Sequence, residues 1–420
     1  MTRSEYRRMK KKKEHEERLK RREAWEAARG PMDLPFLLLA IMLLTIGLIM
    51  LLSASFPMAQ ASSDYNYDAL YFFKRQAVFA IAGIAAMYAV SKINYHRFEG
   101  IAKMGLIVSI ILLILVLLPG PKANGKLFGL TRNGATRWLG IPGLESAQFQ
   151  PSEVAKLGLI VYFAQSISRK REKMKTFREG FLPHAAILIL VAGLTLLEHH
   201  FSGALLICGI GAAMLVVGGI HWGWIAAGVS GLGIASYILV FTDWFEQLTA
   251  KLHYNAARIG VWKDPFGGDL TTQQGDAYQI IQSLITVGSG GLLGVGLGKS
   301  RQKFSFLPER HNDFIFAIVF EELGLVGASL IMLLFSLLVI RGFWLAINAR
   351  DRFGSLLIIG VTTQIALQTF LNIAVVTNFI PATGISLPFF SYGGTALAIQ
   401  LVEVGIVLSV SRQIPAPKGG

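Results

Sequence analysis

Long apolar runs alternate with polar connections along most of the chain. Many of these runs hold about 18 to 22 residues, the length that crosses a hydrocarbon core of roughly 30 Å. A buried helix of a soluble protein is usually shorter and carries a polar stripe. The pattern therefore predicts an all-α polytopic membrane protein with ten spans, at 34–53, 73–90, 101–119, 152–168, 182–198, 201–220, 223–241, 313–340, 354–375 and 392–410.

Composition supports a membrane protein and argues against a soluble globule. Apolar residues make up 53% of the 420 residues, and charged residues only 16%, against roughly 25% in soluble domains. Cys208 is the single cysteine, so the chain cannot form an internal disulfide.

The positive charge is concentrated at the N-terminus, where residues 1–30 hold 12 of the 40 lysines and arginines. Such an arm can be a nucleic-acid tail, but a positive-inside anchor that touches anionic lipid explains it better. We therefore predict no nucleic-acid partner. The arm 1–33 and the tail 412–420 are both expected in the cytoplasm.

Two predicted outer segments, 120–151 and 242–312, are too long to be simple connections. The first breaks the charge rule, with Lys122, Lys126, Arg132 and Arg137 against one acid, Glu145. Positive charge on an outer face suggests an anionic ligand such as a diphosphate. The alternative is that Arg137, beside Trp138, only anchors the chain at the membrane interface.

The second outer segment contains a glycine-rich run, 288–298, followed by Lys299 and Ser300. Its end resembles a phosphate-binding loop, but that motif requires a glycine where Leu293 stands. We therefore expect these glycines to permit tight turns or a re-entrant segment packed within the protein.

Several charged residues fall inside predicted spans, where charge is costly without a partner or a wet cavity. Glu153 and Lys156 share one helix face and can form an ion pair, which is either structural or part of a cavity wall. Glu321, Glu322 and Glu403 are candidates for cavity or helix-packing groups.

Asp313 precedes an apolar helix at the predicted outer mouth of the eighth span. A carboxylate there can simply cap free backbone N–H groups. It can also stay ionised at the membrane surface, beside Arg310 and His311, and accept a proton from a sugar hydroxyl.

Four separated stretches together resemble the SEDS family of cell-wall polymerases. They are Gly-Ala-Thr-Arg-Trp at 134–138, Phe-Gln-Pro-Ser-Glu at 149–153, the segment 307–316, and Leu-Pro-Phe-Phe-Ser-Tyr-Gly-Gly at 387–394. Residues 34–411 would then form the SEDS-type transmembrane domain. The segment 372–377 is most similar to the FtsW and SpoVE branch, and the RodA branch is the close alternative.

The resemblance implies a peptidoglycan glycosyltransferase that polymerises lipid II and releases undecaprenyl diphosphate by an inverting displacement. It implies that Asp313 is the catalytic residue. The substrate-binding residues that we predict are Arg137, Glu153, Lys156, Arg310, His311, Gln282, Ser283 and Ser391. A divalent cation, Mg²⁺ or Mn²⁺, is a further possible requirement.

The resemblance also implies partners and a location: a class B penicillin-binding protein, other division proteins, and the division septum of a bacterial inner membrane. A lipid II flippase and a non-enzymatic division scaffold are the alternatives. Roles in division, sporulation and elongation are not separated by the sequence. Two features depart from the family pattern: Asn312 stands where threonine is usual, and 268–276 resembles an insertion.

Overall fold

The structure is a computed structural model, which describes residues 30–118, 130–132, 135–141, 144–198, 200–221, 276–304 and 306–414, with isolated positions between 223 and 265. Most of the predicted arm, the last six residues of the tail, nearly all of the insertion 268–276 and much of the span 223–241 lie outside the described residues. The number of ten spans therefore stays a prediction, as does the position of the large loop between the seventh and eighth.

Within the described ranges, each of the other predicted spans overlaps a helix. These helices are α2 (Leu34–Ala61), α3 (Tyr71–Ser91), α4 (His96–Leu117), α5 (Pro151–Lys170), α6 (Leu182–Leu197), α7 (Phe201–Val217), α12 (Ile315–Ile347), α13 (Arg352–Val376) and α14 (Gly394–Ser411). Seven helical segments of the described chain are long and apolar enough to cross a membrane: α2, α3, α4, Phe177–Leu197, α12, α13 and α14. The chain is thus a mainly helical, multispan membrane protein.

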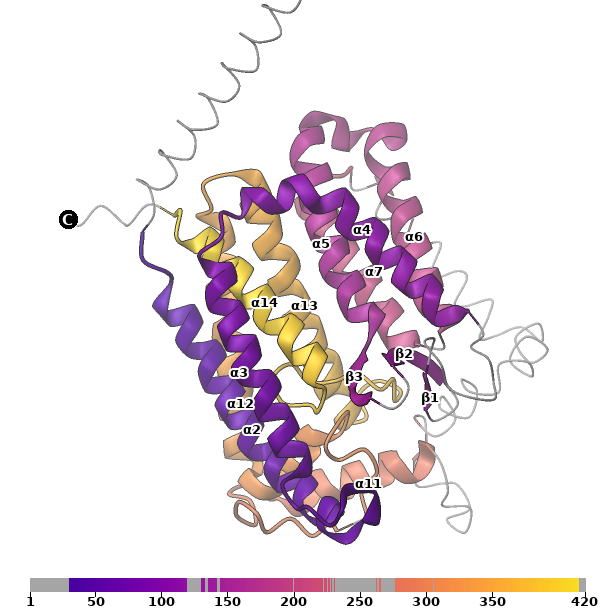
Figure 1. Cartoon of the computed structure of the whole chain (residues 1–420), viewed down its shortest axis with the longest axis vertical. Helices are drawn as coiled ribbons and strands as arrows, with labels where there is room; N and C mark the ends of the chain where they lie inside the picture. The colour runs from indigo at the N-terminus through magenta and orange to yellow at the C-terminus, as the bar shows by residue number, and fades with distance from the viewer. Residues whose placement is uncertain are drawn as a thin grey trace, which may run out of the picture.

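The helices form two groups that stand side by side (Figure 1). One group contains α2, α3, α12, α13 and α14, in which α14 packs on α3 and α12 packs on α2 and α13. The other contains α4, α5, α6 and α7. α5 and α7 also contact α13, so that the two groups meet along these three helices.

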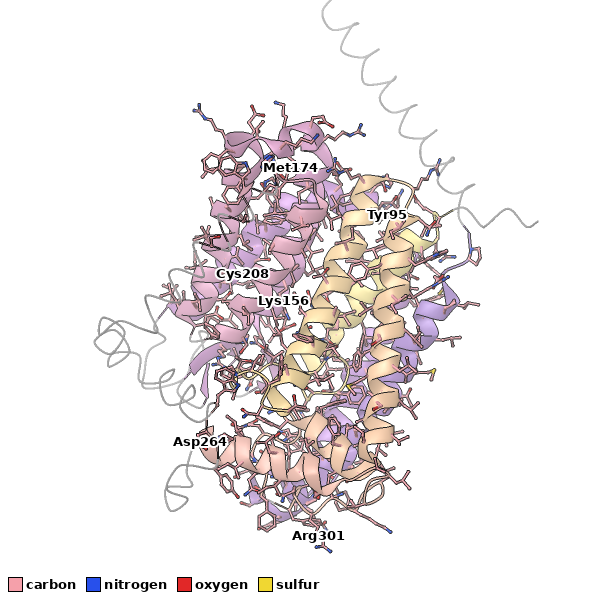
Figure 2. The ribbon with its side chains drawn as sticks, turned by 180° about the vertical axis from the view of Figure 1, so that it is seen from behind. Tyr95, Lys156, Met174, Cys208, Asp264 and Arg301 are labelled. Atoms are coloured by element: carbon pink, nitrogen blue, oxygen red, sulfur yellow. The ribbon has the colours of Figure 1, made fainter. Side chains whose placement is uncertain are left out.

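Charged caps fix the helix ends at one end of the bundle. Asp33 accepts a hydrogen bond from the backbone N–H of Phe36 at 2.9 Å and pairs with Arg341 of α12 at 2.5 Å. Asp351 caps α13 and accepts a hydrogen bond from the hydroxyl of Tyr95 at 2.6 Å. Tyr95 and Met174 lie at this end and Arg301 at the opposite end (Figure 2). The basic α3–α4 and α5–α6 connections therefore share one end.

The segment 120–151 contains a small sheet that the sequence analysis did not predict. Strands β1 (Leu130–Arg132), β2 (Ala135–Ile141) and β3 (Leu144–Phe149) are antiparallel in the order β1-β2-β3. Such short strands pair their backbone groups locally between two helices, without a long apolar run that would mark them. The expectation of an all-α chain was therefore incomplete, and β2 contacts both α4 and α5.

The glycine-rich run packs into a break in α12, as its glycines led us to expect. Helix α11 (Asp276–Ser289) lies across the end of the bundle and leads into the glycine-rich run (Figure 1). Gly324 interrupts α12 with φ +70° and ψ −175°, which frees backbone groups on either side. The N–H groups of Val295 and Gly296 donate to the carbonyls at 321 and 322, at 2.9 and 3.0 Å. We call residues 290–298 the glycine turn.

Candidate active site

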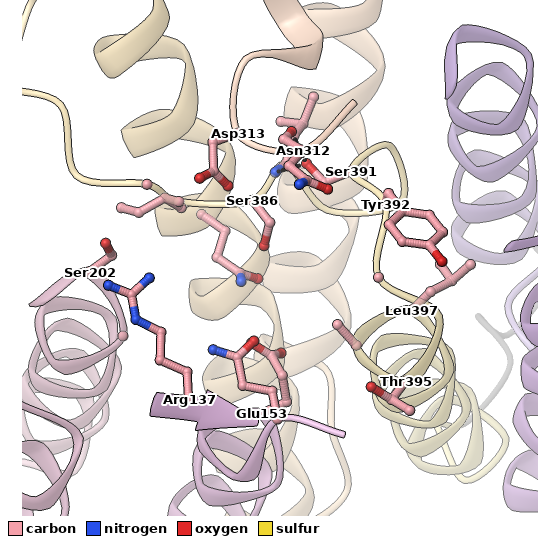
Figure 3. A pocket seen from close by; sticks show the side chains of 18 of the residues that line it. Arg137, Glu153, Ser202, Asn312, Asp313, Ser386, Ser391, Tyr392, Thr395 and Leu397 are labelled. Carbon is pink, nitrogen blue, oxygen red and sulfur yellow. Dashed lines mark hydrogen bonds between the residues drawn. The ribbon is translucent and has the colours of Figure 1, made fainter. Parts of the chain in front are cut away.

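A cavity of about 480 Å³ opens between the two helix groups, at the end that carries α11 and the sheet. Charged and polar side chains from distant parts of the sequence line it (Figure 3). Among them are Arg75, Arg137, Glu153, Lys156, His200, Glu309, Asn312, Asp313 and Ser391.

Asp313 enters the cavity from a tight turn immediately before α12. Glu309 has a left-handed φ of +49°, and the N–H groups of Asn312 and Phe314 donate to its carbonyl at 2.9 and 3.3 Å. The N-cap position of α12 is Phe314, and no side chain caps it. Asp313 therefore lies one residue before the N-cap of α12 and is not itself the N-cap residue.

The broken segment between α13 and α14 holds this turn in place. The Ser391 hydroxyl donates to the carbonyl of Asn312 at 2.7 Å, and the N–H of Tyr392 donates to the carbonyl of His311 at 2.9 Å. Asn372 of α13 donates to the carbonyl of Asp313 at 2.8 Å. Hydrogen bonds from two sides thus fix the backbone that carries the carboxylate.

Cationic side chains enter the cavity from three other elements. Arg137 comes from β2, Arg75 from α3 and Lys156 from α5. Arg137 and Glu153 lie on the side opposite Asp313 (Figure 3). Lys156 is only 1% exposed and pairs with Glu153 at 2.9 Å, so the predicted ion pair exists and forms part of the cavity wall.

Four of the predicted substrate contacts do not line the cavity. Arg310 is buried and donates to the carbonyl of Leu307 at 3.1 Å. The ring of His311 packs on Phe72, with ring centroids 4.7 Å apart. Ser283 donates to the carbonyl of Val376 at 2.8 Å, and Gln282 lies beside it on α11. The structure thus brings Asp313, Arg137, Glu153, Lys156 and Ser391 together, and leaves Arg310, His311, Gln282 and Ser283 outside.

Other residues that line the cavity, among them Arg75 and His200, were not predicted from the sequence. Arg75 follows Lys74 near the start of α3. Its guanidinium contacts the Tyr71 ring, 5.3 Å from the ring centroid. His200 lies within 3.4 Å of Ser152 and 3.3 Å of the Gln150 amide. For His200, the sequence signal was the short polar connection 198–200 between two predicted spans. Its polarity alone does not indicate that the His200 side chain turns toward the cavity.

Burial sets the protonation of three side chains in the connections near the cavity end. Burial lowers the pKa of His200 to about 3, helped by the positive charges of Arg137 and Lys156. Burial raises the pKa of Glu198 to about 8, which the charge of Arg137 opposes. Burial also lowers the pKa of His311 to about 4. At neutral pH both histidines are therefore neutral.

The described residues contain no group of three His, Cys, Asp or Glu side chains that could enclose a metal ion. Mg²⁺ is often held by one or two carboxylates together with substrate phosphates. Asp313 and Glu309 line the same cavity and could supply such ligands. The divalent cation that we predicted from sequence stays a prediction.

Comparison with known proteins gives consistent relatives. The chain is 39% identical to stage V sporulation protein E of Bacillus subtilis, over 90% of this chain and 97% of that protein. It is 38% identical to the probable peptidoglycan glycosyltransferase FtsW of Geobacter metallireducens, over 91% and 95%.

Solved structures agree with these relatives. A chain of a peptidoglycan synthase complex, studied for its coordination of polymerization and crosslinking, matches with a TM-score of 0.70 and 27% identity, over 91% of this chain and 98% of that chain. The rod shape determining protein RodA of Thermus thermophilus matches with a TM-score of 0.64 and 25% identity, over 92% and 98%. The model of the FtsW, RodA and SpoVE family, described as cell cycle proteins, matches residues 34–415. The chain therefore belongs to the FtsW/RodA/SpoVE family of cell cycle proteins.

Proposed function

We propose that the chain is a peptidoglycan glycosyltransferase that polymerises lipid II at the outer face of a bacterial cytoplasmic membrane. The observation that carries this proposal is one cavity in which the Asp313 carboxylate shares the space with Arg75, Arg137 and Lys156. A base and several cations suit a reaction in which a hydroxyl attacks a sugar bound to a diphosphate. The names of the FtsW relatives support the same activity.

In this mechanism Asp313 takes the proton of the acceptor hydroxyl as that oxygen attacks the anomeric carbon of the lipid-linked sugar. The new carbon–oxygen bond forms as the bond to the diphosphate breaks, and the leaving electron pair stays on undecaprenyl diphosphate. Attack opposite the leaving group inverts the anomeric centre, from the α linkage of lipid II to a β linkage. Arg137 and Lys156 stabilise the negative charge that develops on the leaving group.

The direct test is polymerisation of lipid II by purified wild-type protein and by Asp313→Asn in detergent or proteoliposomes. Loss of general base catalysis costs typically 10²–10⁴-fold, so we expect a loss of about that size. Asp64→Asn is the control, because Asp64 is an exposed carboxylate outside the cavity lining. Wild-type rates from folded Asp313→Asn protein would overturn the assignment of the base.

The cavity also suits the alternative of a lipid II flippase. At membrane depth, Gln364 of α13 donates to Glu403 of α14 at 2.9 Å, and both side chains are buried. Gln368, one turn further along α13, lines the cavity itself. Polar groups at that depth often mark transport pathways. A flippase would move lipid II across vesicles and leave no polymer, whereas the glycosyltransferase forms glycan chains from accessible lipid II.

Partner and orientation follow from the same proposal. The end that carries Tyr95 and the basic connections would be cytoplasmic, with both termini, and the cavity would face outward. A class B penicillin-binding protein would crosslink the new strand, as the similarity to a polymerising and crosslinking complex suggests. Action at the division septum, with other division proteins, belongs to the same proposal. A non-enzymatic scaffold would instead retain function in Asp313→Asn cells and lose it without residues 1–30.

A further inference from the structure

The glycine turn exposes apolar side chains at the cavity end of the molecule. Leu293 is 82% exposed and Leu292 68% exposed, and Leu297 is more than half exposed. Further along the same segment, Phe304 and Phe306 are also exposed. A hydrophilic outer loop would not usually present so many adjacent apolar side chains to water.

Two buried or half-buried charge clusters on α2 and α12 locate this turn relative to a membrane. At one end Asp33 pairs with Arg341. Toward the other end Lys303 pairs with Glu322 of α12 at 3.0 Å and donates to Ser53 of α2 at 3.1 Å.

The separation of the two clusters matches one hydrocarbon thickness. Ser53 lies nineteen residues beyond Leu34, and Glu322 lies nineteen residues before Arg341. At a helical rise of about 1.5 Å per residue, the continuous interval on α2 spans about 28 Å. The interval on α12 has the same number of residues but crosses the break at Gly324. A hydrocarbon core is roughly 30 Å thick, so the Lys303 cluster marks its boundary on the cavity side.

The backbone register places the leucines at or just inside that boundary. The N–H of Leu325 donates to the carbonyl of Gly291 at 2.9 Å, and that of Val326 donates to the carbonyl of Leu292 at 3.1 Å. Leu325 and Val326 are themselves about half exposed on α12. The exposed leucines therefore continue the apolar face of a membrane-spanning helix.

We propose that the glycine turn inserts Leu292 and Leu293 into the lipid leaflet on the cavity side. Lys299 and Arg301, both exposed on the same segment, would meet lipid headgroup phosphates above it. The backbone of the turn tolerates this depth because the broken part of α12 satisfies several of its hydrogen bonds. The insertion anchors α11, and with it one rim of the cavity, at the membrane surface.

Spin labelling of the whole chain in lipid nanodiscs tests this inference. In a Cys208→Ser background, nitroxides at Leu293→Cys, Leu330→Cys and Asp64→Cys report accessibility to oxygen, which concentrates in lipid, and to a water-soluble nickel complex. Leu330 lies on the exposed face of α12, and Asp64 lies in an exposed connection, so they give the lipid and water references. Leu292→Cys provides a second position if one label disturbs the turn.

We expect the labels at 293 and 292 to match Leu330→Cys, with high oxygen and low nickel accessibility. Accessibility like that of Asp64→Cys would place the turn in water and overturn the inference. Protection from both reagents would also overturn it, since a protein surface, such as a second copy of this chain, would then cover the leucines. None of these outcomes depends on polymerase activity, so failure here leaves the proposed function unaffected.

Discussion

The side-chain amide of Asn372 donates to the backbone carbonyl of Asp313 at 2.8 Å and to that of Ile385 at 2.6 Å. One buried side chain on α13 thus ties the turn before α12 to the broken segment before α14. The position of the proposed base is set by this link between three parts of the chain.

Asn372→Leu should therefore lower both activity and stability. It removes the hydrogen bonds that Asn372 donates to two carbonyls, and a buried group left unsatisfied costs about 1–3 kcal/mol. Asn348→Leu is the matched control, because Asn348 is exposed and donates only to Trp344 of its own helix. Thermal unfolding and lipid II polymerisation measure the two effects, and equal behaviour of the two variants would contradict this role.

Gly384→Ala should reduce activity by crowding Asp313. Gly384 has φ +69°, and a Cβ there would lie 3.2 Å from Oδ2 of Asp313. The left-handed backbone costs a non-glycine residue roughly 1–2 kcal/mol, and the contact moves the carboxylate as well. In Gly193→Ala the new Cβ meets nothing within 4 Å, and alanine favours a helix interior by roughly 0.5–1 kcal/mol. Only the first variant should lose polymerisation rate.

Substitutions at Lys156 and Glu153 separate stability from function. Lys156→Met leaves the buried Glu153 carboxylate without its ion-pair partner, which typically costs 3–5 kcal/mol. In the double variant Lys156→Met/Glu153→Gln we expect stability to return and polymerisation to stay low, because the cation near the leaving group is still missing. Recovery of both would show that the pair is only structural.

The ion pair Lys303–Glu322 lies outside the cavity lining and serves as the control for the cavity pair Glu153–Lys156. It is equally buried, with 5% and 0% of the side chains exposed, but neither residue lines the cavity. Lys303→Met/Glu322→Gln should therefore recover both stability and polymerisation relative to Lys303→Met alone. Continued inactivity of a stable double variant would reveal a catalytic influence of this cluster.

Acid should destabilise the fold through two buried histidines. The pKa of His200 is lowered to about 3 and that of His311 to about 4, from 6.5 in the unfolded chain. Between those values the unfolded state binds more protons, so stability is complete above pH 6.5 and falls as the pH drops below it. Each histidine contributes a loss of about 1.4 kcal/mol per pH unit. His200→Asn should flatten the acid limb of melting temperature against pH.

Glu198 changes the stability of the fold with pH in the opposite direction, between pH 4.5 and about 8. Its pKa is raised from 4.5 to about 8, so the folded state binds more protons between those values. Stability from this group is present below pH 4.5 and is lost as the pH rises toward 8. Glu198→Gln should remove that loss and make the melting temperature less sensitive to pH between 6.5 and 8. An unchanged profile would contradict a buried, protonated carboxyl.

The helices were readable from sequence, because each long apolar run satisfies its own backbone in lipid whatever its neighbours do. The ion pair of Glu153 and Lys156 was also readable from sequence, because two residues three positions apart on a helix share one face. The tight turns of the glycine-rich run were also expected from its glycines, whereas its packing partner at the Gly324 break and its exposed leucines were not.

Only the tertiary structure decided which polar residues share a cavity. Arg75, Arg137, Lys156 and Asp313 come from four elements far apart in sequence. Arg310 and His311 adjoin Asp313 yet lie outside the cavity lining, because the turn at Glu309 directs neighbouring side chains differently. Local patterns thus determined the membrane-spanning helices, whereas the convergence of charges depends on packing between distant helices, which no local pattern encodes.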